Sequence, residues 1–194
     1  MGKARRRTIV VYGASSPKAL PVYTDAAYRL GRLLAESGRS LVTGAGRTGL
    51  MAAVENGALE HGGTVTGVIP QFMVDNGWMH PGLTKVIVTP GMHQRKKRMS
   101  RMAHAVVALP GGTGTFEELF EIITWKMLGL FLKPVIILNT DHYYDPILTM
   151  LRSAVDQKFM SSRFTDLWSV AETPEQVIEL IDSIPEWDCS ECKI

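Results

Sequence analysis

Three short runs of apolar, mostly β-branched residues constrain the fold of this chain more than any other feature. They read IVVY at residues 9–12, VVAL at 106–109 and VIIL at 135–138. A strand with one solvated face alternates apolar and polar residues, whereas these runs contain no polar position. Strands of this kind are buried on both faces, as in a parallel sheet that is covered by helices on each side.

The rest of the chain alternates between such strands and amphipathic helical windows. We expect strands at residues 8–12, 40–43, 64–69, 84–89, 105–109, 134–139 and 167–171, and helices at residues 23–37, 48–61, 92–103, 114–130, 145–158 and 174–184. Residues 70–83 are expected to form an irregular loop. This β-α-β alternation predicts a Rossmann-like α/β fold, a doubly wound parallel sheet with helices on both faces.

Length and composition fit one folded unit. The chain has 194 residues, 45% of them hydrophobic, which is enough for a core without disulfides or metals. No repeat or linker interrupts it, so we expect a single domain over 1–194, with a basic tail at 1–7 and a second tail at 186–194. No run approaches the roughly 18 apolar residues of a membrane span. The apolar run after the basic start is too short for a signal peptide, so we expect a cytoplasmic protein.

Two cysteines, Cys189 and Cys192, stand in a C-x-x-C spacing within the C-terminal tail. A redox pair is expected near a strand–helix junction, and a structural zinc ion needs about four ligands. We therefore interpret them as tail thiols, the alternative being a metal or disulfide link between chains. His93 has no His or Cys at metal-binding spacing nearby, so the sequence predicts no metal and no cofactor.

Glycine- or serine-rich turns follow three predicted strands, at residues 13–16, 44–49 and 110–115. The carboxyl ends of parallel strands form the ligand edge of such a sheet, so these turns should converge. The third turn, PGGTGT, opens a helix whose first N–H groups and dipole favour a phosphate. It is not a Walker A motif, because no Lys follows the glycines. The second turn, GAGRTG, repeats the design, with Arg47 as a phosphate partner; for both turns the alternative is tight packing without a ligand.

The helix after the third turn places one carboxylate near that phosphate site. Its apolar stripe predicts the face that packs on the sheet, and consists of Phe116, Leu119, Phe120, Ile123, Met127 and Leu130. Glu118 falls roughly 100° or more from this stripe, so we expect it outside the core, one turn above the phosphate. There it would reach the sugar of a nucleotide; the alternative is a Glu that only stabilises the helix dipole.

Residues 92–101 read MHQRKKRMSR, with five cations between Arg95 and Arg101. Arg95, Met99 and Met102 are spaced i, i+4, i+7, which places Arg95 on the buried side of a helix. We expect one or two of these cations to bind phosphate or carboxylate. The alternatives are a solvated basic helix and a nucleic-acid surface, but the net charge of +2 and the lack of interleaved aromatic residues disfavour nucleic acid.

The motifs GMHQRKKRM at residues 91–99 and ALPGGTGTFEEL at 108–119 together resemble those of the LOG family, and the resemblance extends over residues 11–146. It implies a Rossmann-like homodimer that splits a nucleoside 5′-monophosphate into free base and ribose 5-phosphate. The nucleotide would be AMP or its N6-modified cytokinin form. Members long carried the label of lysine decarboxylase, which does not fit here, because no Lys has the context of a pyridoxal phosphate Schiff base.

Arg95 and Glu118 match the catalytic pair of this family. The positions that match its substrate-binding residues, together with those that the glycine-rich turns add, are Lys96, Gly111, Gly112, Thr113, Gly114, Thr115, Thr124, Gly44, Gly46 and Ser15. The family often has Glu where this chain has Gly77, and a triple glycine where it has Gly-Ala-Gly at 44–46. We expect loop residues 72–81 to form the wall around the base, with Met73, Trp78 and Met79 as its apolar lining.

These residues suggest a hydrolytic mechanism without a metal. The phosphate binds residues 111–115, while Glu118 holds the ribose hydroxyls and stabilises an oxocarbenium-like transition state, or orients the attacking water. Arg95 stabilises the departing base or orients Glu118. The competing hypothesis is a non-catalytic nucleotide or nucleotide-cofactor binding protein, similar to the molybdenum-cofactor carriers. On the far face of the same helix, Trp125 and Leu128 suggest contact with a second subunit.

Overall fold

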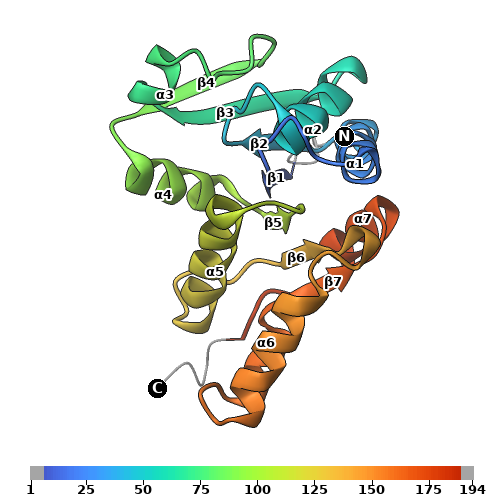
Figure 1. Ribbon diagram of the computed structural model, residues 1–194, viewed down its shortest axis with the longest axis vertical. Helices are drawn as coiled ribbons and strands as arrows, with labels where there is room; N and C mark the ends of the chain where they lie inside the picture. Colours follow the sequence, from blue (N-terminus) through green and yellow to red (C-terminus); the bar gives the residue numbers. More distant parts are fainter. Residues whose placement is uncertain (1–6, 189–194) are drawn as a thin grey trace, which may run out of the picture.

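The computed structural model describes residues 7–188, and these form one seven-stranded sheet covered by helices (Figure 1). The strands are β1 (Thr8–Tyr12), β2 (Ser40–Thr43), β3 (Thr64–Pro70), β4 (Lys85–Thr89), β5 (Ala105–Ala108), β6 (Val135–Leu138) and β7 (Ser169–Ala171). Their order across the sheet is β4-β3-β2-β1-β5-β6-β7, and every pairing is parallel. The predicted doubly wound parallel sheet is confirmed.

Three long helices cover each face of the sheet. The helices are α1 (Pro21–Glu36), α2 (Gly49–Glu60), α3 (Gln71–Asp75), α4 (Met92–Met102), α5 (Thr113–Met127), α6 (Asp145–Asp156) and α7 (Pro174–Ser183), with 3₁₀ turns η1 (Thr140–His142) and η2 (Ser162–Leu167). Buried residues of α1, α2 and α7 pack on one face, and those of α4, α5 and α6 pack on the other. Within residues 7–188 no helix has the length and apolarity that crossing a bilayer requires.

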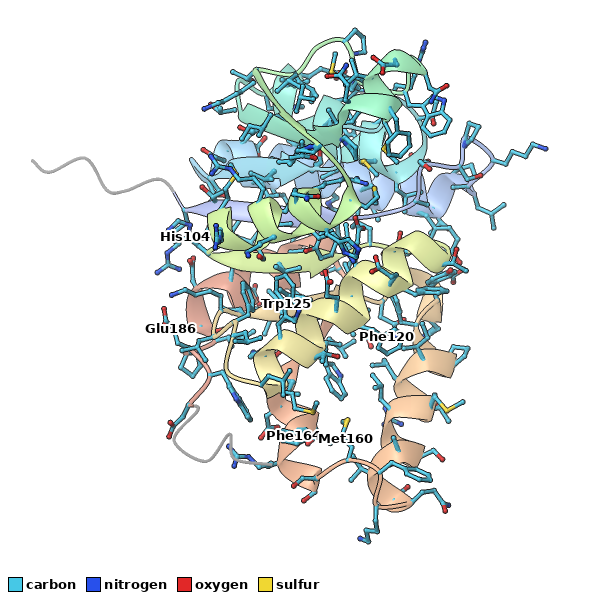
Figure 2. All side chains as sticks on the ribbon, turned by 90° about the vertical axis from the view of Figure 1, so that its left-hand side faces the viewer. His104, Phe120, Trp125, Met160, Phe164 and Glu186 are labelled. Carbon is cyan, nitrogen blue, oxygen red and sulfur yellow. The ribbon has the colours of Figure 1, made fainter. Side chains whose placement is uncertain are left out.

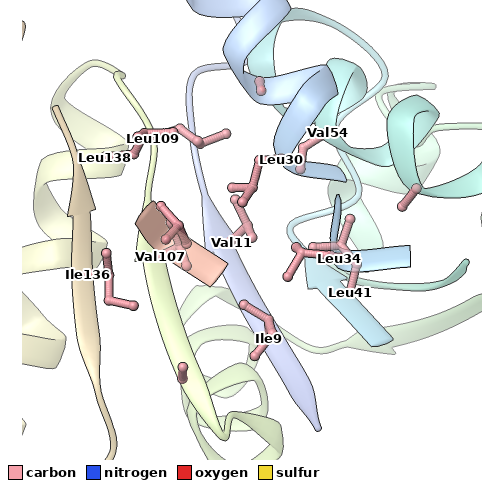
Figure 3. Close-up of a cluster of buried hydrophobic side chains, with 14 of the residues drawn as sticks. Ile9, Val11, Leu30, Leu34, Leu41, Val54, Val107, Leu109, Ile136 and Leu138 are labelled. Carbon is pink, nitrogen blue, oxygen red and sulfur yellow. The ribbon is translucent and has the colours of Figure 1, made fainter. Parts of the chain in front are cut away.

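Strand β1 shows why the core is apolar on both sides. Ile9 and Val11 belong to the cluster that contacts α1 and α2 (Figure 3), while Val10 and Tyr12 belong to the cluster under α4 and α5. All four are at most 3% exposed. Successive side chains of a strand point to opposite faces, so a strand without polar positions is what two covered faces require.

The structure corrects several boundaries. The region predicted as an irregular loop contains the short helix α3, and the helix predicted to reach residue 130 ends at Met127. Gly129, with φ of +74°, stops α5 because this left-handed conformation favours glycine after a helix. Helix α1 begins at Pro21, two residues before the predicted start at residue 23, and Pro21 lies in its first turn. The two tail cysteines and residues 1–6 lie outside the described residues.

The chain reverses its direction across the sheet between β1 and β5. From β1 the strands run outward to β4, and β5 then returns to the other side of β1. In open parallel sheets a ligand crevice lies beyond the carboxyl ends of the strands at such a point. We therefore expect a ligand-binding site at the turns that follow β1 and β5.

Candidate active site

The three predicted turns meet around one cavity of about 680 Å³. Its walls come from the ends of β1, β2, β3 and β5 and from the first turns of α2, α4 and α5. The residues that line it are Gly13, Ala14, Ser15, Ser16, Gly44, Gly46, Arg47, Thr48, Met51, Ile69, Met73, Trp78, Met92, Arg95, Gly112, Thr113, Gly114, Thr115, Glu117 and Glu118. This volume lies within the range of roughly 300–1,000 Å³ that is usual for small-molecule sites.

In the turn before α5 the backbone carbonyls accept hydrogen bonds from other parts of the protein, whereas the backbone amides stay available to a ligand. Tyr144 Oη donates to Leu109 O at 2.7 Å, Ala14 N donates to Pro110 O at 3.1 Å, and Tyr143 Oη donates to Gly111 O. The first N–H groups of a helix have no carbonyl partner within it, and here they belong to residues 113–115. They open into the cavity at the positive end of the α5 dipole, where an anion is stabilised.

The glycines of this turn differ in what requires them. A Cβ on Gly111 would lie 2.1 Å from Thr115 Oγ1, so packing within the protein excludes a side chain there. A Cβ on Gly112 or Gly114 would have no described atom within 4 Å. Those two positions face the open cavity, and glycine leaves room for a ligand to approach the backbone closely.

The second turn is bonded to the first. Met51 N donates to Ala14 O at 3.1 Å, and Thr48 Oγ1 donates to Ser15 O at 2.6 Å. Gly49 has φ of +68°, and a Cβ there would lie 2.6 Å from Ala14 O, so the two turns touch through this glycine. Because Met51 N already has an acceptor, the start of α2 offers less to a phosphate than the start of α5 does.

Arg95 and Glu118 face each other inside the cavity. Arg95, from α4, is 5% exposed and Glu118, from α5, is 7% exposed. Arg95 Nε donates to Val68 O at 3.1 Å and Arg95 Nη2 donates to Gly44 O at 3.3 Å. Arg95 Nη2 lies 3.9 Å from Glu118 Oε1, which is too long for a direct hydrogen bond. The pair attracts electrostatically and leaves polar atoms of both residues free for a ligand.

Glu118 is buried, but it belongs to neither apolar cluster and lines the cavity, so its predicted place outside the core is confirmed. Part of the predicted apolar stripe is wrong. The buried residues of α5 are Thr115, Glu118, Leu119, Ile122, Ile123 and Lys126. Phe120 is 39% exposed and Leu130 is 71% exposed. The other four residues of the stripe pack in the apolar cluster on this face of the sheet, and they are Phe116, Leu119, Ile123 and Met127.

Burial in this site disfavours the charged form of Glu118. It raises the pKa of that carboxyl to about 7, and the nearby carboxylates of Glu117 and Glu121 add to the rise, while Arg95 and Lys96 oppose it. The buried Tyr12 phenol also senses the charge of Glu118. A carboxyl that changes ionisation near neutral pH suits proton transfer or charge stabilisation.

Three predicted binding residues do not line the cavity. Lys96 is buried and its ammonium pairs with Glu117 and, at 3.1 Å, with Glu121. Thr124 is exposed, and its hydroxyl donates to Phe120 O at 2.7 Å within α5. Gly111 lies beneath Thr115. Ser15, Gly44, Gly46 and residues 112–115 do line the cavity, as does Arg47, whose Nη1 donates to Gly77 O at 2.9 Å.

Five large apolar side chains also line the cavity. They are those of Ile69, Met51, Met73, Met92 and Trp78. Trp78 is 51% exposed and meets Phe72 edge-on, with 6.4 Å between ring centroids. Met73 and Trp78 were predicted to line the cavity and do so, whereas Met79 is not among the lining residues. The predictions also missed Met51 and Met92, which periodicity alone places on helices but not toward a ligand.

Comparisons with known proteins agree with this architecture. A family model described as "Possible lysine decarboxylase" matches residues 51–181. Cytokinin riboside 5′-monophosphate phosphoribohydrolase LOG2 from Arabidopsis thaliana is 40% identical over 187 residues, covering 96% of this chain and 88% of that protein. The cytokinin riboside 5′-monophosphate phosphoribohydrolase from Rhodococcoides fascians is 42% identical over 156 residues, covering 80% of this chain and 79% of that protein.

Solved structures share the same fold. The molybdenum cofactor binding protein from Rippkaea orientalis matches with a TM-score of 0.73 and 27% identity, covering 93% of this chain and 98% of that one. DNA processing protein A from Streptococcus pneumoniae has a TM-score of 0.59 and 13% identity, covering 90% and 61%, and shows the fold alone. From the sequence matches together with the PGGTGTFEE turn beside a buried arginine, this chain belongs to the LOG family of cytokinin riboside 5′-monophosphate phosphoribohydrolases.

Proposed function

We propose that this chain hydrolyses the N-glycosidic bond of a nucleoside 5′-monophosphate, AMP or its N6-modified cytokinin form. Water adds its oxygen to C1′ of the ribose, the bond from C1′ to the base nitrogen breaks, and the base leaves with a proton. The products are the free base and ribose 5-phosphate. The observation that carries the proposal is the buried pair of Arg95 and Glu118, one helical turn from the free amides that begin α5.

In this proposal the polar and the apolar residues that line the cavity bind different parts of the substrate. The 5′-phosphate accepts hydrogen bonds from the amides of residues 112–115, from the hydroxyls of Thr113 and Thr115, and from Ser15 across the crevice. The base lies against the large apolar side chains, among which Trp78 offers a flat surface. The ribose then lies between the phosphate and the base, beside Glu118.

Charge placement supports the catalytic assignment. Cleavage of a glycosidic bond builds positive charge at the anomeric carbon, and a carboxylate beside it stabilises that charge or orients the water. The guanidinium of Arg95 stabilises electron density that moves into the base. Because the two groups stand 3.9 Å apart without a direct bond, a water or a ribose hydroxyl can bridge them.

Lys96 and Thr124 require other roles. Lys96 acts through Glu117, a carboxylate that lines the cavity and that the ammonium holds in place. Thr124 lies on the outer side of α5, close in sequence to the exposed Phe120 and the half-buried Trp125; Figure 2 shows both aromatic residues on this helix. We propose that this face contacts a second copy of the chain, so that Thr124 would reach a substrate-binding site only in a homodimer.

A single domain and a cytoplasmic location stay predictions from the sequence.

The test is chromatography of AMP and isopentenyl-AMP after incubation with the purified protein, with adenosine as the substrate that lacks a phosphate. We expect free base and ribose 5-phosphate from the monophosphates only. Glu118→Gln and Arg95→Ala should each abolish most turnover. Their matched controls, Glu179→Gln on α7 and Arg98→Ala on the exposed side of α4, should not.

The alternative is a binding protein without turnover, which the structural likeness to the molybdenum cofactor binding protein favours. Intact nucleotides under conditions where calorimetry detects their binding would support it and refute the hydrolase. Light scattering of the same protein gives the mass of the particle, and a monomer would contradict the proposed subunit contact.

A further inference from the structure

A second buried polar cluster lies beneath the turn after β2 and outside the cavity. Thr43, at the end of β2, and Glu55, in the middle of α2, are both completely buried. Neither side chain lines the cavity. The mechanism proposed above uses neither of them. Burying a carboxyl costs free energy unless a neighbouring group forms a hydrogen bond with it, so the burial of Glu55 requires an explanation.

The cluster forms a continuous chain of hydrogen bonds. Thr43 Oγ1 donates its proton to Glu55 Oε1 and accepts one from Ala45 N at 3.1 Å. Ala45 N belongs to the same peptide unit as the carbonyl of Gly44. That carbonyl accepts from Arg95 Nη2 at 3.3 Å. The plane of a single peptide therefore connects Glu55 on one side to Arg95 on the other.

This peptide plane needs support from outside. Ala45 has φ of +64°, the left-handed conformation that residues with a Cβ rarely adopt, and such a backbone costs on the order of 1–3 kcal/mol. The bond to Thr43 holds the N–H side of the plane. On the far side of Ala45, His80 N donates to Ala45 O at 2.9 Å. The turn keeps its shape because it is bonded at both ends.

Arg95 depends on the orientation of that plane. Its guanidinium is directed by two carbonyls, those of Val68 and Gly44. If the Gly44 carbonyl turned away, Nη2 would lose its acceptor and the nearest anion would be Glu118 Oε1, now 3.9 Å away. A direct ion pair between the two groups would then occupy the polar atoms that face a ligand.

We propose that Glu55 is a positioning residue for Arg95, acting through the Thr43 hydroxyl and the Gly44–Ala45 peptide. The proposal rests on the proposed function, since it concerns how the catalytic arginine is held apart from Glu118. Its chemical requirement is specific: position 43 must both donate and accept, and position 55 must accept.

Conservative and disruptive variants separate this role from general stability. Thr43→Val keeps the shape of the side chain and removes the hydroxyl, whereas Thr43→Ser keeps the hydroxyl and removes a methyl group. Glu55→Met removes the acceptor from the other end, whereas Glu55→Gln keeps it. We expect Thr43→Val and Glu55→Met to lower kcat about tenfold with little change in KM, and the Ser and Gln variants to stay within about threefold.

Two further readouts would not respond to a role in stability alone. A closer Arg95 lowers the pKa of Glu118, so the acid limb of the kcat profile should move to lower pH in Thr43→Val. In an Arg95→Ala background, Thr43→Val should have no additional effect on kcat, because the residue through which it acts is absent. Equal kcat in the Val and Ser variants, or an undiminished effect in the Arg95→Ala background, would overturn the proposal.

A measurement without substrate keeps the inference separate from the proposed function. The side-chain ¹⁵N–¹H signals of Arg95, assigned by Arg95→Lys, report whether rotation about its Cζ–Nη bonds is slow. We expect slow rotation about these bonds in the parent protein and in Thr43→Ser. In Thr43→Val we expect fast rotation or a change in the chemical shifts of the Arg95 side chain. If Thr43→Val does not fold, Glu55→Met replaces it. Unchanged Arg95 signals in the disruptive variant would refute the role of Glu55. A parent protein in which the Arg95 guanidinium rotates slowly but no substrate is turned over would refute only the hydrolase.

Discussion

Replacing Glu55 by Gln should stabilise the protein by an amount that grows with pH. Burial raises the pKa of the Glu55 carboxyl to about 8 from its usual 4.5, and its Oε2 has no hydrogen-bond partner among the described residues. Between pH 4.5 and 8 the folded state keeps a proton that the unfolded state has lost. The stability of the parent protein therefore falls as pH rises through this window.

The size of the effect follows from the two pKa values. Each unit of difference is worth about 1.4 kcal/mol, so Glu55 costs roughly 3 kcal/mol at pH 7 and roughly 5 kcal/mol above pH 8. Glutamine never ionises, and it still accepts the Thr43 hydroxyl. With a urea m-value of about 2 kcal/mol/M, the midpoint of Glu55→Gln should lie about 1.5 M above that of the parent at pH 7, and the two should nearly coincide at pH 4.5.

The assay is urea unfolding at pH values from 4.5 to 9, followed by tryptophan fluorescence. Glu118 and the other titrating groups are present in both proteins, so the difference between the two reports Glu55 together with His80, whose Nδ1 lies 3.9 Å from Glu55 Oε2 and whose pKa burial lowers. A difference that stayed constant across the pH range would refute the reasoning, since it would mean that Glu55 has the same pKa in the folded and unfolded states.

Three further predictions concern the site and the helix packing. Gly44→Ala should reduce kcat/KM by more than about 100-fold, measured with AMP, because a Cβ there would lie 1.6 Å from Arg95 Nη2. If the carboxylate form of Glu118 is the active one, kcat/KM should fall about tenfold per pH unit below pH 7, where this group gains its proton; a flat profile down to pH 5 would contradict that role. Gly31→Ala should lower the unfolding free energy by about 1–3 kcal/mol in urea, because its Cβ would meet the Val54 carbonyl at 2.0 Å, where α1 and α2 cross.

The fold was predictable from the sequence because it depends on local pattern. An apolar run such as residues 9–12 is typical of a strand in a sheet that is covered on both faces, and in the structure these four residues are buried in such a sheet. The convergence of the three turns followed from topology, since parallel strands end at the same edge. Arg95 was placed correctly on the buried side of α4, because methionines share its helical face.

The failures have a common physical cause. Periodicity assumes that a buried position is apolar, yet α5 buries Glu118 and Lys126 and exposes Phe120. Glu55 lies at i+4 from Met51 on the buried side of α2, a position that looks like an error in the apolar pattern. Such residues are tolerated only because of partners distant in sequence, such as Thr43 for Glu55, and no local pattern contains that information.

The cavity is lined by two unlike kinds of group, and this bears on the kind of molecule that it favours. The turn before α5 supplies helix amides and hydroxyls, whereas Met51, Met73, Met92 and Trp78 supply thioethers and an indole. At the start of α2, Met51 N is already bonded to Ala14 O, so the start of α5 is the stronger receptor for an anion. We therefore expect the crevice to favour a molecule with a single anionic end and an apolar remainder over one that carries charge along its whole length.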